Sequence, residues 1–199
     1  MADPANRATA VEAALNDAIV LATWLRDLER TEGGIERLAG HLAGVLSAGG
    51  RVLTCGNGGS LCDAMHFAEE MSGRFRNDRP ALAVQAMADP THLTCVANDY
   101  GFEQVFARGV EAWGNAGDAL VVFSTSGKSP NLIAAVEAAR RRGLSVVGLL
   151  GRDGGPLKSA CDHVIVVPGN TSDRIQEVHI KVVHLLIELI ETRLFGRAV

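Results

Sequence analysis

The chain has no excess of basic residues and no apolar run long enough to cross a membrane. Its 199 residues include 19 Lys or Arg and 23 Asp or Glu, a formal net charge of -4. General nucleic-acid binding needs a dense basic face, so this class is disfavoured. The apolar stretch from Ala18 to Leu25 is too short to span a bilayer, and the N-terminus does not read as a secretion signal. We therefore expect a cytoplasmic protein without nucleic-acid or membrane partners.

Three familiar motifs are also missing. No C-x-x-C pair occurs among the four cysteines, which favours reduced thiols and argues against a cysteine-based zinc site. The nucleotide P-loop spacing G-x-x-x-x-G-K-[ST] is absent, and no G-x-G-x-x-G stands in the dinucleotide position. ATP and NAD therefore lose support as ligands.

Two helices are expected before the first strand. Apolar residues recur at helical spacing from Ala8 to Glu32 and from Ile35 to Ser47, with Gly33 and Gly34 between them. We interpret these helices as an antiparallel pair. The first carries more apolar residues than one sheet face needs, which indicates either packing against another subunit or simple intramolecular packing.

Strands and helices alternate after Arg51. Strands are expected over residues 52–55, 81–86, 119–123, 145–150 and 163–167, and helices over 60–74, 91–98, 102–113, 131–142 and 173–195. Near-continuous β-branched runs are typical of parallel strands that are covered on both faces. The sequence predicts an α/β three-layer sandwich with a five-stranded parallel sheet. We expect one domain over residues 1–199, with an N-terminal helical pair (1–50) and an α/β core (51–199).

A glycine-rich turn follows the first expected strand. Gly56, Gly58 and Gly59 allow a sharp turn that brings backbone N–H groups close to a ligand, and Ser60 is expected to cap the next helix. A helix N-terminus attracts a phosphate or sugar oxygen. Because residues four apart share a helix face, His66 and Glu70 are expected to converge near that ligand.

A second turn, after the third expected strand, is rich in hydroxyl groups. Ser124, Thr125, Ser126 and Ser129 place four hydroxyls within six residues, and Pro130 suits the first position of a helix. Ordinary helix capping would need only one of them. We therefore favour a phosphate site, to which Lys128 would add charge, and a small sugar phosphate that extends toward Asn57, His66 and Glu70.

The final expected helix carries polar residues on an otherwise apolar pattern. Gln176 and His184 lie two turns apart on roughly one side. A lone histidine on such a helix usually has a structural role, and His92 and His179 keep that interpretation. His184 stands out because Gln176 points the same way and a His/Glu pair already exists upstream.

These motifs, in this order, resemble the bacterial phosphoheptose isomerases of the sugar isomerase (SIS) family, which have a flavodoxin-like fold. The matching segments are residues 56–60, 63–70, 98–99, 124–127 and 174–177, and the resemblance runs from about Leu15 to Phe195. It implies an aldose–ketose isomerase that converts sedoheptulose 7-phosphate into D-glycero-D-manno-heptose 7-phosphate, for lipopolysaccharide or other surface glycans. It also implies a homotetramer with active sites between subunits.

The resemblance further implies which residues act. One zinc ion per subunit maps to His66, Glu70, Gln176 and His184, of which Glu70 and His184 occupy the acid–base positions. Substrate contacts map to Asn57, Gly58, Gly59, Ser60, Glu70, Asn98, Asp99, Ser124, Thr125, Ser126, Ser129 and Gln176, with Arg74 and Asp173 as further positions.

Two points stay open at this stage. Glu70 is expected to move a proton between C1 and C2 while His184 serves an oxygen, but the roles could be exchanged, and zinc ligation would lower the basicity of Glu70. The alternative function is a non-catalytic SIS interaction protein, of the kind that partners a replication initiator. Such proteins tend to lack the acid and the imidazole at positions 70 and 184. A sugar-phosphate-sensing regulator would need a DNA-binding helix, and none is expected before Arg51.

Overall fold

Five parallel strands form the central sheet in the order β2-β1-β3-β4-β5. The computed structural model describes the backbone of residues 4–196 and the side chains of residues 9–196. The strands are β1 (Val52–Gly56), β2 (Val84–Ala86), β3 (Ala119–Ser124), β4 (Ser145–Gly151) and β5 (His163–Val167). This confirms the predicted five-stranded parallel sheet.

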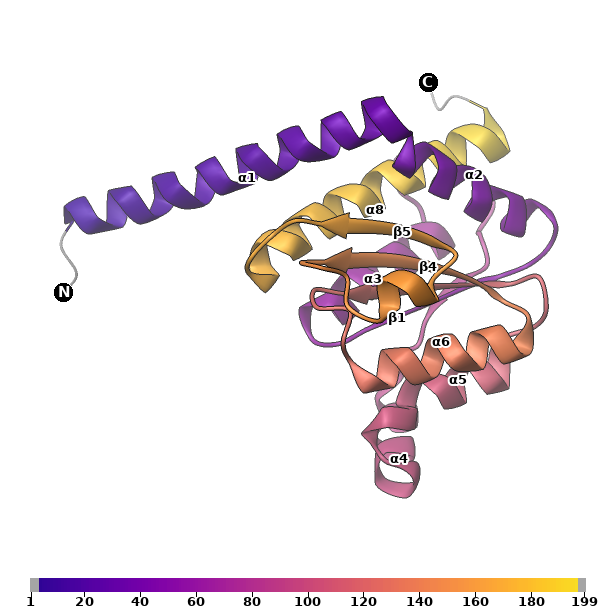
Figure 1. The fold of residues 1–199 in the computed structure, drawn as a ribbon. Helices are drawn as coiled ribbons and strands as arrows, with labels where there is room; N and C mark the ends of the chain where they lie inside the picture. The colour runs from indigo at the N-terminus through magenta and orange to yellow at the C-terminus, as the bar shows by residue number, and fades with distance from the viewer. Residues whose placement is uncertain (1–3, 197–199) are drawn as a thin grey trace.

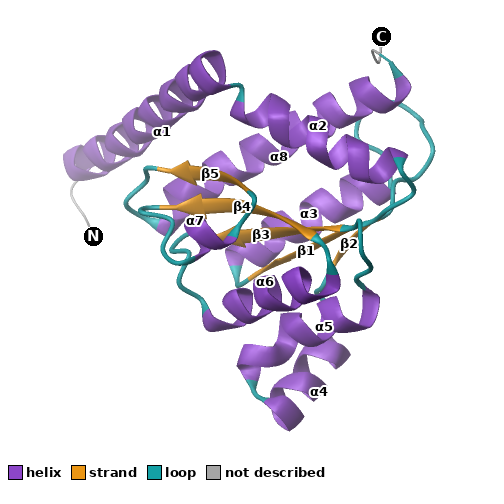
Figure 2. Cartoon of the chain, turned by 45° about the vertical axis from the view of Figure 1, so that its right-hand side comes forward, coloured by secondary structure: helices purple, strands orange, loops and turns teal. Residues whose placement is uncertain are grey.

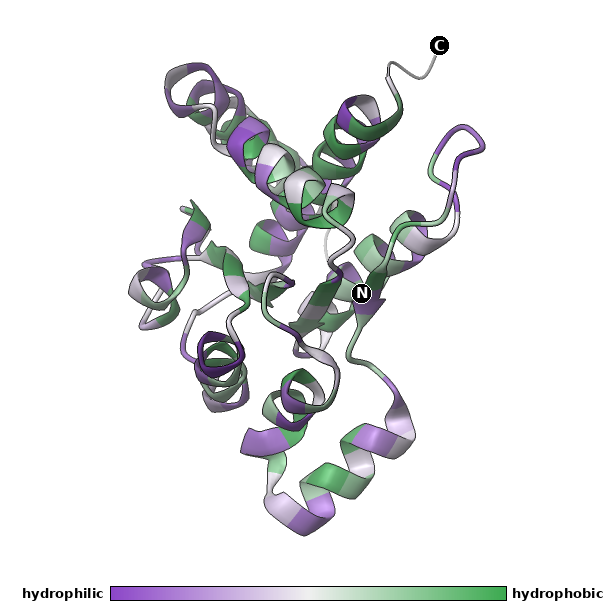
Figure 3. Ribbon diagram, turned by 90° about the vertical axis from the view of Figure 1, so that its right-hand side faces the viewer, coloured by the Kyte–Doolittle hydropathy of each residue, from purple (hydrophilic) through white to green (hydrophobic). Residues whose placement is uncertain are grey.

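Helices cover both faces of this sheet, so the predicted three-layer sandwich is confirmed (Figures 1 and 2). One buried cluster lies between the sheet and α1, α2, α3 and α8, and the other between the sheet and the helices from α4 to α7. In Figure 3 the central strands are mostly coloured as hydrophobic, whereas the surrounding helices alternate in colour. The helices are α1 (Pro4–Glu32), α2 (Gly34–Ser47), α3 (Gly59–Ser72), α4 (Pro90–Tyr100), the 3₁₀ turn η1 (Phe102–Gln104), α5 (Val105–Trp113), α6 (Pro130–Arg142), α7 (Leu157–Ala160) and α8 (Ser172–Phe195).

Strand β2 is shorter than the expected strand over residues 81–86. Only its three residues pair with β1, in the register Val52 to Val84. Leu82 instead donates its amide to the carbonyl of Met71 at the end of α3, 3.0 Å away. The segment before β2 is therefore tied to a helix rather than to the sheet.

The two N-terminal helices exist, but their predicted antiparallel pairing is wrong. Helix α2 leads away from α1 instead of returning along it (Figures 1 and 2). Gly33 joins them in a left-handed conformation (φ 58°), and the Glu29 carboxylate accepts the amide of Ile35 at 2.7 Å. A junction of one residue leaves no room for a reversal, and both helices pack on α8.

Helix α1 extends beyond the body of the molecule (Figure 1). It buries Leu21 and Leu25 in the core, and it also carries apolar side chains that are more than half exposed, namely Val11, Leu15, Ile19 and Val20. Between α1 and α8 lies a groove of about 650 Å³ that is lined largely by apolar side chains such as Leu21, Leu25 and Val178. No helix within the described residues is both long and apolar enough to span a bilayer.

Candidate active site

The two turns singled out in the sequence lie side by side at the carboxyl end of the sheet. Gly56 at the end of β1 is the register partner of Phe123 in β3. After β1 the chain adds β2 on one side and then β3 on the other, so the direction of winding switches between β1 and β3. Ligands of open α/β sheets bind at such a switch point.

Glycine is required at two positions of the first turn. A Cβ at Gly56 would lie 2.6 Å from the carbonyl oxygen of Ser60, closer than carbon and oxygen approach without a bond. Gly58 has φ 55° and ψ -124°, a conformation that side chains disfavour, and it precedes the first residue of α3. The turn therefore aims the N-terminus of α3 at the space beside β3.

The predicted cap of α3 is wrong. The helix begins at Gly59, with Gly58 at the N-cap and no side-chain cap. Ser60 already lies inside the first turn, because its amide donates to the carbonyl of Asn57 at 3.0 Å. Its hydroxyl instead accepts a hydrogen bond from Gln176 Nε2 on α8, 3.4 Å away.

The second turn is built around its hydroxyls. Ser124 Oγ accepts the amide of Gly127 at 3.0 Å, and Ser126 Oγ accepts that of Lys128 at 3.3 Å. Ser129 stands at the N-cap of α6 and makes no side-chain cap bond, so helix capping does not explain its hydroxyl. The two turns together enclose a pocket of about 60 Å³, lined by Asn57, Ser60, Phe123, Ser124, Thr125, Ser126, Ser129 and Leu132.

Lys128 faces away from this pocket. Its Nζ pairs with Asp153 Oδ2 at 3.2 Å, and the hydrogen bond from Lys128 lowers the pKa of the Asp153 carboxyl. Attraction for an anion inside the pocket therefore comes from hydroxyls, from backbone amides and from the N-termini of α3 and α6.

A buried amide pair joins the two turns. Asn131 in the first turn of α6 donates Nδ2 to Asn57 Oδ1 at 2.8 Å, and Asn57 Nδ2 donates back to Asn131 Oδ1 at 3.0 Å. Asn131 is only 2% exposed. Sequence reasoning missed it, although an amide among the inward-facing apolar residues of a helix was an available signal.

Three titratable side chains meet further along α3. His66 Nε2 lies 3.4 Å from Glu70 Oε1 on the next turn and 3.3 Å from His184 Nε2 on α8. The predicted convergence of His66 and Glu70 is therefore confirmed. Burial, and then the neighbouring His66, lower the pKa of His184, whose ring stacks on Phe75 with centroids 5.8 Å apart.

Two separations measured from His66 are compatible with a shared tetrahedral metal, but the ligand atoms that all lie within 4.8 Å of one another belong to His66, Glu69 and Glu70 and not to His184. Two ligand atoms each about 2.0–2.2 Å from a tetrahedral zinc are separated by roughly 3.4 Å. Both the His66 to His184 and the His66 to Glu70 separations lie near that value. Glu69, which the sequence did not single out, also has a carboxylate oxygen within 4.8 Å of the ligand atoms of His66 and Glu70.

Asp63 lies beside this group, on the buried side of α3. It is 8% exposed, and its Oδ2 has no hydrogen-bond partner among the described residues. Burial raises the pKa of its carboxyl to about 6, against an opposing effect of His66.

Other predicted site residues lie apart from this cluster. Gln176 contacts Ser60, and eight residues of α8, or about 12 Å of helix, separate it from His184. Asn98 and Asp99 are exposed near the end of α4, where Asn98 Nδ2 donates to Asp99 Oδ1 at 2.8 Å. Their roles, and those of the exposed Arg74 and Asp173, stay predictions.

The structural interpretation of two histidines is confirmed. His179 is fully buried and contacts the carbonyl of Leu150 at 3.1 Å, and burial lowers its pKa to about 4. His92 contacts the carbonyl of Val105 at 3.0 Å and packs against Trp113.

Known proteins share this combination of fold and motifs. The family model described as SIS domain matches residues 18–151. The chain is 53% identical to the phosphoheptose isomerase of Sodalis glossinidius over 185 residues, which cover 92% of this chain and 95% of that one. It is 56% identical to the phosphoheptose isomerase of Fusobacterium nucleatum over 160 residues, 80% of this chain and 82% of that one. The chain belongs to the phosphoheptose isomerase family of SIS-domain proteins.

A solved structure of this family has the same arrangement. The phosphoheptose isomerase of Neisseria gonorrhoeae superposes with a TM-score of 0.86 at 38% identity, covering 92% of this chain and 98% of that chain. The family resemblance drawn from the motifs is thus confirmed over nearly the whole length of the chain.

Proposed function

We propose that the protein isomerises sedoheptulose 7-phosphate to D-glycero-D-manno-heptose 7-phosphate, and this proposal is supported by relatives that are named phosphoheptose isomerase. One observation carries this assignment. The hydroxyl-rich pocket at Ser60 and the acid–base group at His66 lie six residues apart on α3, roughly 9 Å along the helix. A chain of seven carbons, with bonds of about 1.5 Å, spans roughly 7–8 Å. A heptose phosphate is long enough to join the two ends, whereas a triose phosphate is not.

The pocket between the turns would hold the phosphate. Hydroxyls of Ser124, Thr125, Ser126 and Ser129 donate to its oxygens, and the Asn57–Asn131 pair fixes the two turns relative to each other. The first turn adds the backbone amides of Gly58 and Gly59, and Gln176 lies beside them. With the phosphate held there, the sugar would lie along α3 with its carbonyl end toward His66.

Glu70 and His184 would move the protons. The Glu70 carboxylate takes the proton from C1 of the ketose and returns it to C2, while His184 gives a proton to the carbonyl oxygen at C2 and takes one from the hydroxyl at C1. The lowered pKa of His184 keeps its imidazole neutral near pH 7, so the ring can both accept and donate a proton. The enediolate between these steps carries negative charge, which nearby donors stabilise.

Zinc is proposed as the metal of this site, held by His66, Glu70 and His184, with Gln176 as the fourth ligand. The separations of about 3.4 Å around His66 support the first three. The Gln176 amide would have to leave Ser60 to join them. Bound zinc would supply a Lewis acid for the substrate oxygens. Dialysis against a chelator, with zinc content measured in the wild type and in His66→Asn, tests the ligand set without relying on turnover.

A homotetramer is proposed as the active form. The exposed apolar side chains of α1 and the groove between α1 and α8 support an interface that involves the N-terminal helices. Asn98 and Asp99 would then contact a substrate that is bound between subunits. Analytical ultracentrifugation of the wild type and of a Leu15→Glu/Ile19→Glu variant tests this assembly. We further propose a cytoplasmic location and a product that feeds lipopolysaccharide or other surface glycans.

The non-catalytic alternative is not favoured. An interaction protein has no need for a carboxylate and two imidazoles within hydrogen-bonding distance, and the curated relatives at 51–56% identity are named as isomerases. The deciding assay incubates purified protein with sedoheptulose 7-phosphate, with and without zinc, and follows the aldoheptose phosphate by NMR. Conversion is the expected result. A folded protein that converts nothing under either condition would overturn the assignment.

A further inference from the structure

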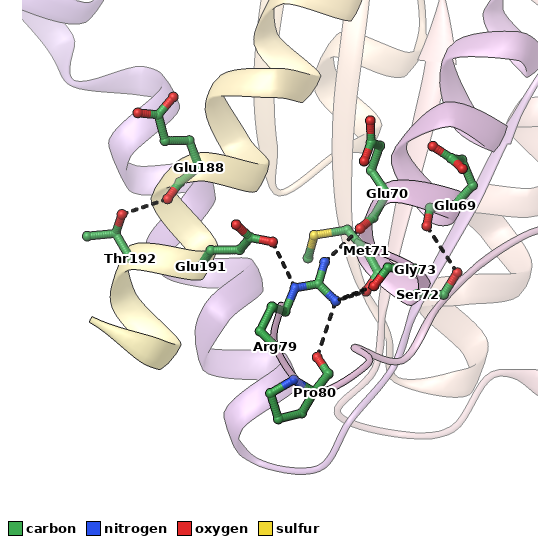
Figure 4. A network of polar contacts seen from close by, with 10 residues as sticks. All are labelled: Glu69, Glu70, Met71, Ser72, Gly73, Arg79, Pro80, Glu188, Glu191 and Thr192. Carbon is green, nitrogen blue, oxygen red and sulfur yellow. Dashed lines mark hydrogen bonds and ion pairs between the residues drawn. The ribbon is translucent and has the colours of Figure 1, made fainter. Parts of the chain in front are cut away.

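The side chain of Arg79 is buried against the C-terminal end of α3, where its guanidinium donates to backbone carbonyls (Figure 4). Its Nη2 donates to the carbonyl of Glu70 at 2.6 Å, and its Nη1 to that of Met71 at 2.7 Å. Nη1 also lies 3.1 Å from the carbonyl oxygen of Gly73 and 3.2 Å from that of Pro80. The last carbonyls of a helix lack partners within it, so one guanidinium completes the end of α3.

Glu191 on α8 holds this guanidinium in place. Its Oε1 accepts from Arg79 Nε at 2.7 Å, and the two side chains are 8% and 5% exposed. Seven residues separate Glu191 from His184, which puts the two on the same side of α8, two turns apart. The pair therefore ties the helical turn that carries Glu70 to the helix that carries His184.

The guanidinium acts on Glu70 through the backbone alone. In Figure 4 the Glu70 carboxylate extends away from Arg79, while its carbonyl oxygen faces the guanidinium. Arg79 is thus no partner for the acid–base carboxylate and does not reach the reacting atoms. What it controls is where the last turn of α3 sits relative to α8.

We propose that Arg79, held by Glu191, is a positioning residue that sets the distance between Glu70 and His184. The inference rests on the proposed function, because it needs these two side chains to be the acid–base pair. A reacting group displaced by 1 Å loses on the order of 10²-fold in rate. Loosening the end of α3 should therefore lower kcat, while the phosphate pocket at the other end of the helix keeps KM unchanged.

Arg79→Lys is the sharpest test, because lysine keeps the charge but lacks the planar fork that reaches carbonyls and carboxylate together. We expect kcat to fall at least tenfold and KM to stay within twofold. Glu191→Gln keeps an acceptor for Arg79 without the charge, and we expect a three- to tenfold fall in kcat with the same KM. Circular dichroism and thermal melting establish that each variant is folded at the assay temperature.

Glu188→Gln is the matched control. Glu188 pairs with Arg76 at 3.1 Å and so also joins α8 to the segment after α3, but both side chains are about half exposed. Its kcat should stay within twofold of the wild type. An equal loss in this control would mean that any change between the two segments lowers the rate.

Each outcome separates this inference from the proposed function. A folded Arg79→Lys with wild-type kcat overturns the positioning role, and so does a fully active Glu191→Gln if the lysine variant fails to fold. Loss of substrate affinity instead of rate also contradicts it. Absence of turnover in the wild type, by contrast, would overturn the proposed function itself.

Discussion

The two ends of the α3–α8 pair differ in their chemistry. Near the start of both helices, Ser60 meets Gln176, and the adjoining pocket is lined by hydroxyls, amides and backbone. Two turns further along, His66, Glu70 and His184 meet, all of which titrate. The proposed function assigns anion binding to the first end and proton exchange to the second. Binding and chemistry should therefore respond to different substitutions.

Glu70→Gln tests the chemical end and should have the largest effect. General acid–base catalysis contributes about 10²–10⁴-fold, so kcat should fall by that factor while KM changes little. Glutamine keeps the size of the side chain and cannot take a proton. Steady-state kinetics on the folded variant measure both constants, and a retained kcat would remove Glu70 from its proposed role.

Glu69→Gln is the neighbouring control for that variant. Glu69 is exposed and close to the same ligand atoms, but the family motif assigns the role to Glu70. We expect a change of less than about threefold in kcat. Equal losses in both variants would show that the site depends on total negative charge rather than on one carboxylate.

His179→Gln separates a structural histidine from His184, the histidine proposed to be catalytic, on the same helix. Burial holds the pKa of His179 at about 4, below its ordinary 6.5. The unfolded chain therefore takes up the proton first as the pH falls, and stability present above pH 6.5 is lost progressively down to about pH 4. The loss amounts to about 3 kcal/mol.

The glutamine variant should lack this part of the pH dependence and keep kcat within twofold near pH 7. Denaturant unfolding at pH 7, 5.5 and 4 measures the difference in unfolding free energy. An identical pH dependence in both proteins would mean that His179 is not the responsible group. A large loss of kcat would place it in the reaction.

Ser126→Ala tests the binding end and should have the smallest effect. Removing one protein hydroxyl that hydrogen-bonds to a charged ligand costs about 1.5 kcal/mol of binding free energy. KM should therefore rise roughly tenfold with kcat nearly unchanged. Ser159→Ala, whose hydroxyl bonds to Pro156 at 3.3 Å in α7, serves as the control. An unchanged KM in Ser126→Ala would locate the phosphate elsewhere.

Local patterns predicted most of the fold. Near-continuous β-branched runs predicted β3, β4 and β5, and glycine and proline positions marked the starts and ends of helices such as α6 at Pro130. The predictions were wrong where contacts between distant parts of the chain determine the local structure. After the junction at Gly33, helix α2 packs on α8, and the Leu82 amide donates to a carbonyl of α3 instead of to the sheet. Hydrophobic periodicity in the sequence reveals neither contact.

Within the candidate site, too, contacts between residues close in sequence were predictable, and contacts between distant residues were not. The contact between His66 and Glu70 was predictable because a helix brings residues four apart together, whereas the contacts of Asn131 and Arg79 were not. Asn131 works through Asn57, 74 residues away in sequence, and Arg79 through Glu191, 112 residues away. Such partners are visible only once the chain has folded.

The central claim is that Glu70 carries a proton between C1 and C2 of a heptose phosphate. Conversion of sedoheptulose 7-phosphate in D₂O, followed by ¹H NMR to equilibrium, tests it most directly. We expect deuterium at C2 of the aldose with the wild type, and formation of the deuterated product at least about 10²-fold more slowly with folded Glu70→Gln. Product that keeps its hydrogen at C2 throughout prolonged incubation would contradict proton transfer by an exchangeable carboxyl group.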